Sequence, residues 1–249
     1  MEERFNAEMF INHICRKRNI QISDFNLAPV VVTSWSNRFV EDFASLINAE
    51  KFTIQLFDAT PIYTGKINEK KCSVVSARVG ASTMVMHLEE IVACGAKIII
   101  NVGFAGSLQV SNPVGSIIIP TDCISEEGTS QHYWNGEKTC DKELSEILYR
   151  NCKSAGLTVS SGKLWTTDAP YRELISKIHE YIKAGVLGVD METSAVYSFG
   201  KYKNIRICNI LVVTDELWTD WNPDFSSPLV SEGLKKLLNI VHDTIKDLK

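Results

Sequence analysis

The stretch VLGVDMETSAVYSFG, residues 186–200, indicates the kind of fold that this chain adopts. Its first four residues form a short apolar run of the kind that ends a buried strand. Asp190, Met191 and Glu192 follow, at the point where a helix is expected to begin. Charged groups at the end of a buried strand are costly unless they have partners. The two carboxylates therefore either cap the helix or hold a ligand, and the local pattern leaves both interpretations open.

The same alternation of apolar, β-branched runs with amphipathic stretches continues along the rest of the chain. It predicts strands at 29–34, 52–57, 72–78, 97–103, 116–120 and 206–213, and helices at 37–49, 82–95, 141–154, 171–183 and after Pro228. Strands alternating with helices are typical of a three-layer α/β fold. We expect a single domain over residues 1–249, in which residues 1–27 form an N-terminal extension that packs on it.

The composition excludes several classes of protein. The chain has 249 residues, 45% of them hydrophobic, which is enough for one large core. A net charge of −4 and the lack of a long basic run argue against a nucleic-acid partner. No run approaches the roughly 18 consecutive apolar residues of a membrane helix, so no membrane partner is expected. The seven cysteines are scattered without a CxxC motif, as in reduced cytoplasmic proteins, and we expect no metal site.

Two predicted strand ends carry arginines that are candidates for binding an anion. In α/β folds ligands collect at the carboxyl ends of strands. Arg38 lies near the start of the helix after the first strand, and Arg78 precedes Gly80, where the backbone can approach a ligand closely. Helix N-termini and guanidinium groups both bind anions. Each segment also has a plain structural interpretation, as a helix cap with a surface arginine or as an ordinary strand-to-helix turn.

Other strand ends carry small, aromatic or acidic residues. Gly103 follows a buried strand and permits close approach of either a ligand or another strand. Trp165 and Tyr171 offer flat surfaces for stacking on a heterocycle, or belong to the core. His132 lies in the polar segment 124–133. Asp215 follows the predicted strand 209–213, where it could act as an acid or cap a helix.

Read in chain order, VGFAGSLQ (102–109), VDMETSAVY (189–197) and VVTDE (212–216) resemble the nucleoside phosphorylase family. This family includes purine nucleoside phosphorylases, uridine phosphorylases and related nucleosidases, and the likeness extends over about residues 28–245. The resemblance implies a single-domain three-layer α/β/α sandwich with a central mixed β-sheet. It also implies inorganic phosphate as co-substrate with no cofactor, and a homodimer or a homohexamer built as a trimer of dimers.

The resemblance assigns roles to the acidic residues. Glu192 matches the glutamate that binds the ribose 2′ and 3′ hydroxyls, and a carboxylate can accept from both at once. Met191 would lie against the sugar as an apolar floor. Asp190 matches a less direct position, where capping the helix is its main expected role. Asp215 matches the aspartate that protonates the purine at N7, which relieves the negative charge on the departing base.

The resemblance favours a purine base and leaves uridine open. Uridine-specific members generally lack a carboxylate at the Asp215 position. They recognise uracil with a glutamine and an arginine after the aromatic loop. That loop here contains Arg172 but no obvious glutamine. The further substrate-binding candidates are Trp165, Tyr171, Arg172, His132, Gly103 and Phe104.

The phosphate site departs from the family pattern. The Gly-Asp-Pro-x-Arg loop reads SWSNR at 34–38, so only Arg38 matches it. Asn101 stands where a second arginine is usual, and Phe104 stands where a hydroxyl-bearing residue is usual. Arg38, Arg78 and the Gly80 amide are the phosphate-binding candidates. Phosphorolysis of a ribonucleoside is the leading hypothesis, and the alternatives are a nucleosidase that uses water and a non-catalytic nucleoside-binding protein.

Overall fold

The computed structural model describes residues 3–52 and 60–248 of the chain, and within them ten strands form one mixed sheet. The sheet order is β10-β9-β6-β7-β8-β5-β1-β4-β3-β2. The strands are β1 Val30–Ser34, β2 Glu50–Phe52, β3 Ile62–Ile67, β4 Lys70–Ser76, β5 Ile98–Ser107, β6 Ile117–Glu126, β7 Val159–Thr167, β8 Gly188–Asp190, β9 Arg206–Glu216 and β10 Asn222–Pro223.

The sheet closes on itself at one end. Strand β9 pairs in parallel with β5 and also pairs antiparallel with β6, while β8 pairs with both β7 and β5. Strands β5, β9, β6, β7 and β8 therefore form a ring of hydrogen-bonded neighbours. The parallel strands β1, β4 and β5 continue from this ring towards the antiparallel edge formed by β3 and β2.

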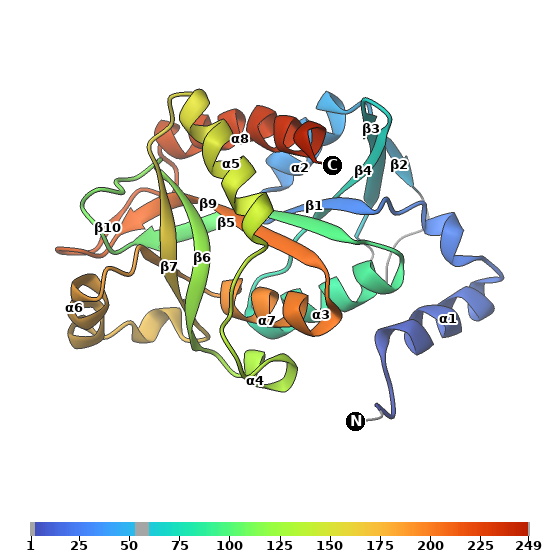
Figure 1. The fold of residues 1–249 in the computed structure, drawn as a ribbon, viewed down its shortest axis with the longest axis horizontal. Helices are drawn as coiled ribbons and strands as arrows, with labels where there is room; N and C mark the ends of the chain where they lie inside the picture. Colours follow the sequence, from blue (N-terminus) through green and yellow to red (C-terminus); the bar gives the residue numbers. More distant parts are fainter. Residues whose placement is uncertain (1–2, 53–59, 249) are drawn as a thin grey trace.

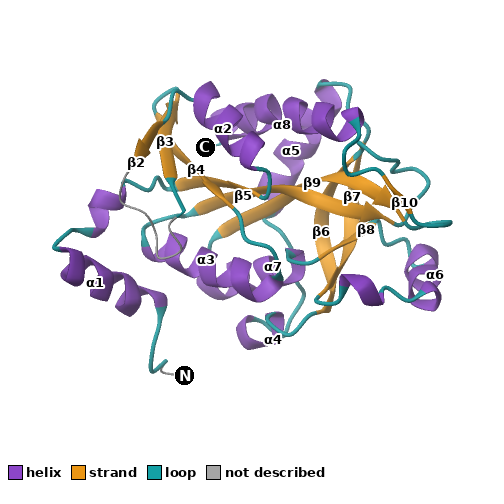
Figure 2. Ribbon diagram, turned by 180° about the vertical axis from the view of Figure 1, so that it is seen from behind, coloured by secondary structure: helices purple, strands orange, loops and turns teal. Residues whose placement is uncertain are grey.

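Helices cover both faces of the sheet, so that the molecule has three layers (Figures 1 and 2). Helices α2, α5 and α8 lie on one face, and α1, α3, α4 and α7 lie on the other, while α6 lies beside the closed end of the sheet. The helices are α1 Ala7–Arg18, α2 Asn37–Leu46, α3 Ala81–Ala93, α4 Ser130–Tyr133, α5 Lys142–Ser154, α6 Ile175–Lys183, α7 Thr193–Lys203 and α8 Pro228–Asp247, with two short 3-10 helices, η1 Ile22–Phe25 and η2 Pro170–Arg172.

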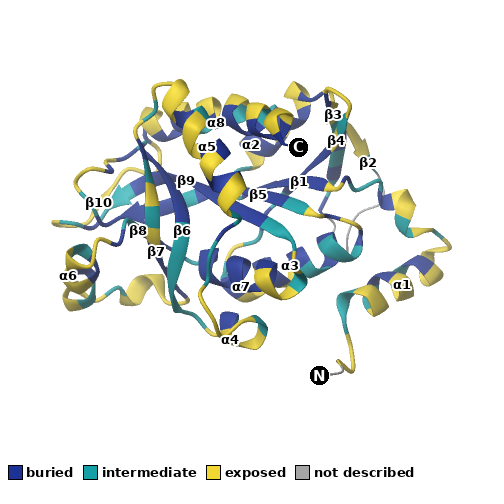
Figure 3. Ribbon diagram, viewed as in Figure 1, coloured by how far each residue is buried: buried dark blue, intermediate teal, exposed yellow. Residues whose placement is uncertain are grey.

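The hydrophobic core fills the two spaces between the sheet and its helices (Figure 3). All five residues of β1 are buried, and β5 and β9 are buried over most of their length, because helices cover them on both sides. An amphipathic helix buries one stripe of apolar residues, as Phe39, Val40 and Phe43 of α2 do. On the opposite face α1 packs beside α3 and buries Ile11 and Cys15.

The three-layer fold with a mixed sheet is confirmed, and the differences lie at particular elements. Strand β7 was not predicted because its first half, VSSGK, contains no apolar run. After Val159 its residues alternate between partly buried and exposed positions. Helix α6 begins at Ile175 rather than at 171, because Pro170 starts a separate 3-10 turn. The strand predicted at 52–57 lies almost entirely in residues 53–59, outside those that the structure describes.

Candidate active site

A cavity of about 970 Å³ opens where the C-terminal parts of β5, β8 and β9 meet. The loop after β7 and the segment after β9 form its outer wall. Its lining residues are Trp35, Val79, Phe104, Ala105, Gly106, Pro170, Tyr171, Glu173, Ile175, Ile178, Val189, Asp190, Met191, Glu192, Leu211, Thr214, Asp215, Leu217, Thr219, Asp220, Trp221 and Phe225.

The β8–α7 junction shows what each of its two carboxylates does. Asp190 is the last residue of β8, and its Oδ2 accepts a hydrogen bond from the Thr193 amide at 3.0 Å and another from the Thr193 hydroxyl. Its Oδ1 accepts from the Thr166 hydroxyl at 2.7 Å. The bond from the Thr193 amide satisfies one orphan donor in the first turn of α7, so the Asp190 side chain caps this end of the helix although Glu192 occupies the N-cap position.

Glu192 is left available for a ligand. Its side chain is buried yet lines the cavity, and its Oε1 accepts from the Gly80 amide at 2.6 Å. Gly80 has a φ of 89°, a backbone conformation that residues with a side chain rarely adopt. In this conformation its amide donates to the Glu192 carboxylate. Burial, followed by the nearby charge of Asp190, raises the pKa of Glu192. Further donors from a bound ligand would favour the ionised form.

A buried polar network ties this junction to the central strands. The Thr33 hydroxyl donates to Asn101 Oδ1 at 2.6 Å, and Asn101 Nδ2 donates to Asn209 Oδ1 at 2.6 Å. Asn209 Nδ2 then donates to the Thr193 hydroxyl at 2.8 Å. Asn101, which stands where the family usually has an arginine, is fully buried and binds within this network rather than lining the cavity.

We expect Asn209→Ala to lower the free energy of unfolding by about 2–4 kcal/mol. The change leaves Asn101 Nδ2 without an acceptor and removes the bond from Asn209 to the Thr193 hydroxyl, which still donates to Asp190. An unsatisfied buried group costs about 1–3 kcal/mol, and a lost hydrogen bond about 0.5–1.5 kcal/mol. Urea denaturation measures the change, with the exposed Asn135→Ala as the control. Equal unfolding midpoints for the two variants would show that the network contributes nothing to stability.

Asp215 lies near the end of β9 and faces the same cavity as Glu192. Its Oδ1 accepts from the Thr214 hydroxyl at 2.9 Å, and its Oδ2 accepts from the Trp221 indole N–H at 3.0 Å. These two bonds fix the carboxyl group at the cavity wall. A group held in this way can transfer a proton to a ligand atom within hydrogen-bond reach.

The structure brings several of the other predicted residues to this cavity. Met191 and Phe104 line it, and Tyr171 is 99% exposed at its rim. Gly103 acts indirectly, because a Cβ there would lie 2.7 Å from Cε3 of Trp35, which itself lines the cavity. The absence of a side chain at Gly103 therefore lets Trp35 pack against β5.

Besides Gly103, three predicted substrate-binding residues lie outside the cavity lining. Trp165 is buried in the core, where its ring meets Tyr181 edge-on at 5.1 Å and its indole N–H donates to Glu126 at 3.0 Å. Its aromatic surface is therefore used for packing. Arg172 on η2 and His132 on α4 are both exposed and do not line the cavity.

The predicted phosphate-binding residues are dispersed. The Arg38 side chain is 79% exposed and pairs with Asp42 at 2.9 Å, one turn along α2. The Arg78 guanidinium donates to Thr60, and Arg78 adjoins the lining residue Val79. The Gly80 amide binds Glu192. Among the described lining residues five are acidic and none is lysine, arginine or histidine. The side chains of the described cavity wall therefore supply carboxyl groups and no cation.

The residue patterns did not single out several lining residues. Glu173 follows η2 and lines the cavity where Arg172 does not, because the 3-10 turn points the two side chains differently. Trp35 lies in SWSNR (34–38), where only Arg38 was singled out, and Leu217 lies two residues after Asp215. Trp221 lines the cavity, and its indole N–H donates to Asp215.

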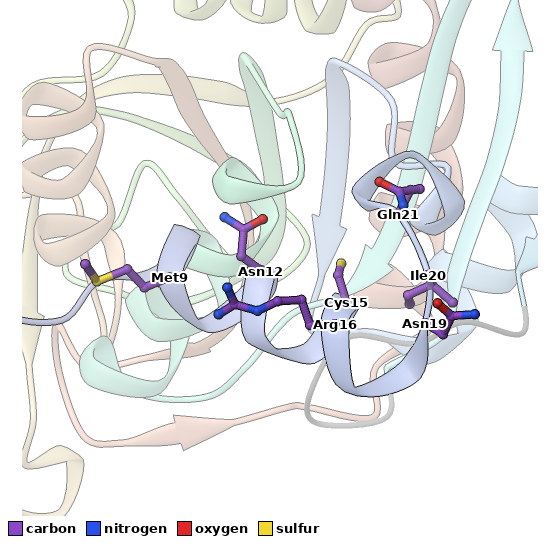
Figure 4. Close-up of a pocket in the computed structure, with 7 residues that line it drawn as sticks. All are labelled: Met9, Asn12, Cys15, Arg16, Asn19, Ile20 and Gln21. Atoms are coloured by element: carbon purple, nitrogen blue, oxygen red, sulfur yellow. The ribbon is translucent and has the colours of Figure 1, made fainter.

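A second, smaller cavity of about 640 Å³ lies along α1 and the turn after it (Figure 4). All its lining residues come from one segment, 9–21, and Arg16 is the charged residue among them. It lacks the converging acidic groups of the larger cavity. Within residues 3–52 and 60–248 no cluster of three His, Cys, Asp or Glu side chains could hold a metal ion. No described helix is both long enough and apolar enough to cross a membrane.

Comparison with known proteins identifies the class to which this fold and site belong. Residues 29–244 match the phosphorylase superfamily, and the chain belongs to this family. The DeoD-type purine nucleoside phosphorylase of an Exiguobacterium species is 28% identical over 161 residues, covering 63% of this chain and 68% of the relative. The corresponding protein of Clostridium novyi is 29% identical over 161 residues, which cover 63% of this chain and 69% of the relative.

Solved structures agree on the fold. The crystal structure of uridine phosphorylase from Vibrio fischeri superposes with a TM-score of 0.79 at 20% identity, covering 90% of this chain and 95% of the other. The resemblance drawn from the three sequence motifs is therefore confirmed at the level of family and fold.

Proposed function

We propose that this protein is a nucleoside phosphorylase that cleaves a purine ribonucleoside into free base and ribose 1-phosphate. The observation that carries the proposal is that Glu192 and Asp215 line one cavity. Two relatives named purine nucleoside phosphorylases support the same activity. Uridine remains a second substrate in the proposal, since the fold is shared with a uridine phosphorylase.

The reaction requires that the enzyme bind the ribose and donate a proton to the base. Glu192 would accept hydrogen bonds from the ribose 2′ and 3′ hydroxyls, with Met191 against the sugar. Phosphate oxygen would attack C1′ as the bond from C1′ to the base breaks, and its electron pair would pass to the base. Asp215 in its acid form would deliver a proton to N7. Inorganic phosphate is the co-substrate, and no cofactor takes part in these steps.

One observation favours a second candidate function, hydrolysis. A phosphate dianion is bound by several N–H donors and positive charge. The described cavity lining carries five carboxylates and no lysine, arginine or histidine, and the Gly80 amide is engaged by Glu192. In a nucleosidase, water would take the place of phosphate at C1′, and the products would be free base and ribose.

The two reactions are separated by base release with and without phosphate. We expect inosine and adenosine to yield free base in phosphate buffer, and phosphate-free buffer to slow the release by at least about tenfold. Ribose 1-phosphate should appear in equal amount to the base. Equal rates in both buffers, with ribose as the product, would contradict phosphorolysis and establish hydrolysis. Binding of nucleoside without any release would support the non-catalytic alternative.

The partners and the assembly of the enzyme are proposed from the resemblance, and its place in the cytoplasm from its scattered cysteines without a CxxC motif. We place the enzyme in the cytoplasm, with nucleoside and phosphate as its partners. We further propose that it assembles as a homodimer or as a trimer of dimers. Light scattering of the purified protein measures its mass directly, and a monomer would contradict this assembly.

A further inference from the structure

The Asp215 region of the cavity contains a second carboxyl group, that of Glu173. Both residues line the cavity, and Glu173 lies between η2 and the start of α6. Among the residues that the structure describes, none donates a hydrogen bond to the Glu173 carboxyl group. Burial, followed by the charge of Asp215, raises the pKa of Glu173 to about 7. The partly buried carboxyl group therefore has no hydrogen-bond donor within the described protein. An N–H group of a ligand would supply that donor and favour the ionised carboxylate.

The hydrogen-bonding groups of the surrounding wall are mainly acceptors. Glu173, Asp215 and Asp220 contribute carboxyl oxygens. The donors of the described wall are largely engaged within the protein. The indole N–H of Trp221 and the hydroxyl of Thr214 both donate to Asp215, and the indole N–H of Trp35 donates to the Arg78 carbonyl. The remaining hydroxyls of this wall, on Tyr171 and Thr219, can accept as well as donate.

We infer that Glu173 accepts a hydrogen bond from an exocyclic amino group of the base, so that the cavity selects 6-aminopurine over 6-oxopurine nucleosides. This inference rests on the proposed function, because it places the base beside Asp215. A 6-amino group offers two N–H donors to the carboxyl oxygens. A 6-oxopurine presents an acceptor at position 6 and carries its N–H at N1. Above pH 7, where Glu173 is ionised, the 6-oxo group would face the carboxylate without a donor between them. Polar groups that are left unpaired in this way discriminate strongly between substrates.

The test compares kcat/KM for adenosine and inosine in the wild type and in Glu173→Gln, at a pH above the raised pKa of Glu173, about 7. Glutamine has nearly the same size, but its amide can both donate and accept, so it no longer distinguishes the two bases. We expect the wild type to prefer adenosine by about tenfold or more, and the variant to lose most of that preference. Glu180→Gln, on the exposed side of α6, is the matched control and should keep the wild-type ratio.

A wild type that prefers inosine, or an unchanged ratio in Glu173→Gln, would overturn the inference while base release itself upheld the proposed function. Calorimetric binding of free adenine and hypoxanthine provides a second measurement that needs no turnover. If the wild type releases no base, the proposed function fails, and the binding ratio still decides the role of Glu173. Tighter binding of adenine that is lost in Glu173→Gln supports it, and the same ratio in both proteins refutes it.

Discussion

Replacing Glu192 by alanine is expected to lower kcat/KM for a ribonucleoside by roughly 100- to 10,000-fold. The carboxylate would accept from two vicinal hydroxyls, and hydrogen bonds to charged groups contribute about 1.5–3 kcal/mol each. Its position between the capped start of α7 and the Gly80 amide leaves it little freedom to turn away from the cavity. Steady-state release of base, measured with adenosine and inosine, gives the change.

The 2′-deoxynucleosides identify which contact is lost. The wild type should discriminate against them, because they offer Glu192 one hydroxyl instead of two. Glu192→Ala should accept the ribo- and deoxyribonucleosides almost equally. Glu146→Ala, an exposed change on α5, should keep both the activity and the discrimination of the wild type. If Glu192→Ala lost activity but still discriminated by the same factor, Glu192 would not be the group that reads the 2′ hydroxyl.

Asp215→Asn is expected to slow purine release by roughly 100- to 10,000-fold, the usual contribution of a general acid. The amide keeps the shape of the side chain, and its single oxygen can still accept from either Thr214 or Trp221, but it cannot transfer the proton. Uridine, whose base has no N7, should lose far less activity. Initial rates of base release for inosine and uridine measure both effects.

The control for this change is Asp224→Asn. Asp224 is exposed in the segment after β9 and lies outside the cavity lining. Its replacement should leave both substrates unaffected. Equal losses for inosine and uridine in Asp215→Asn would mean that Asp215 holds the site together rather than protonating the base.

The sequence predicted the parts of the fold that depend on uninterrupted apolar runs. Strands β1, β5 and β9 were predicted because helices bury them on both faces, which calls for β-branched residues throughout. Strand β7 was missed because its first half has one face exposed. The closure of β5, β9, β6, β7 and β8 into a ring depends on pairings between distant segments, which no local pattern contains.

The candidate site shows the same division. Asp190, Glu192 and Asp215 stand immediately at strand ends, so the rule that ligands collect there placed them correctly at one cavity. Aromatic character alone could not tell that Trp165 packs into the core while Trp221 lines the cavity. Glu173 could not be separated from Arg172, because which of these adjacent side chains faces the cavity depends on the 3-10 turn that ends at Arg172.

A crystal structure with a bound C-nucleoside, whose carbon–carbon bond to the base resists cleavage, tests the central claim most directly. We predict one ligand molecule in the 970 Å³ cavity, with both vicinal hydroxyls within hydrogen-bond distance of Glu192 and a base nitrogen facing Asp215. A ligand that binds elsewhere, or that touches one of these carboxylates while lying out of reach of the other, would contradict the account.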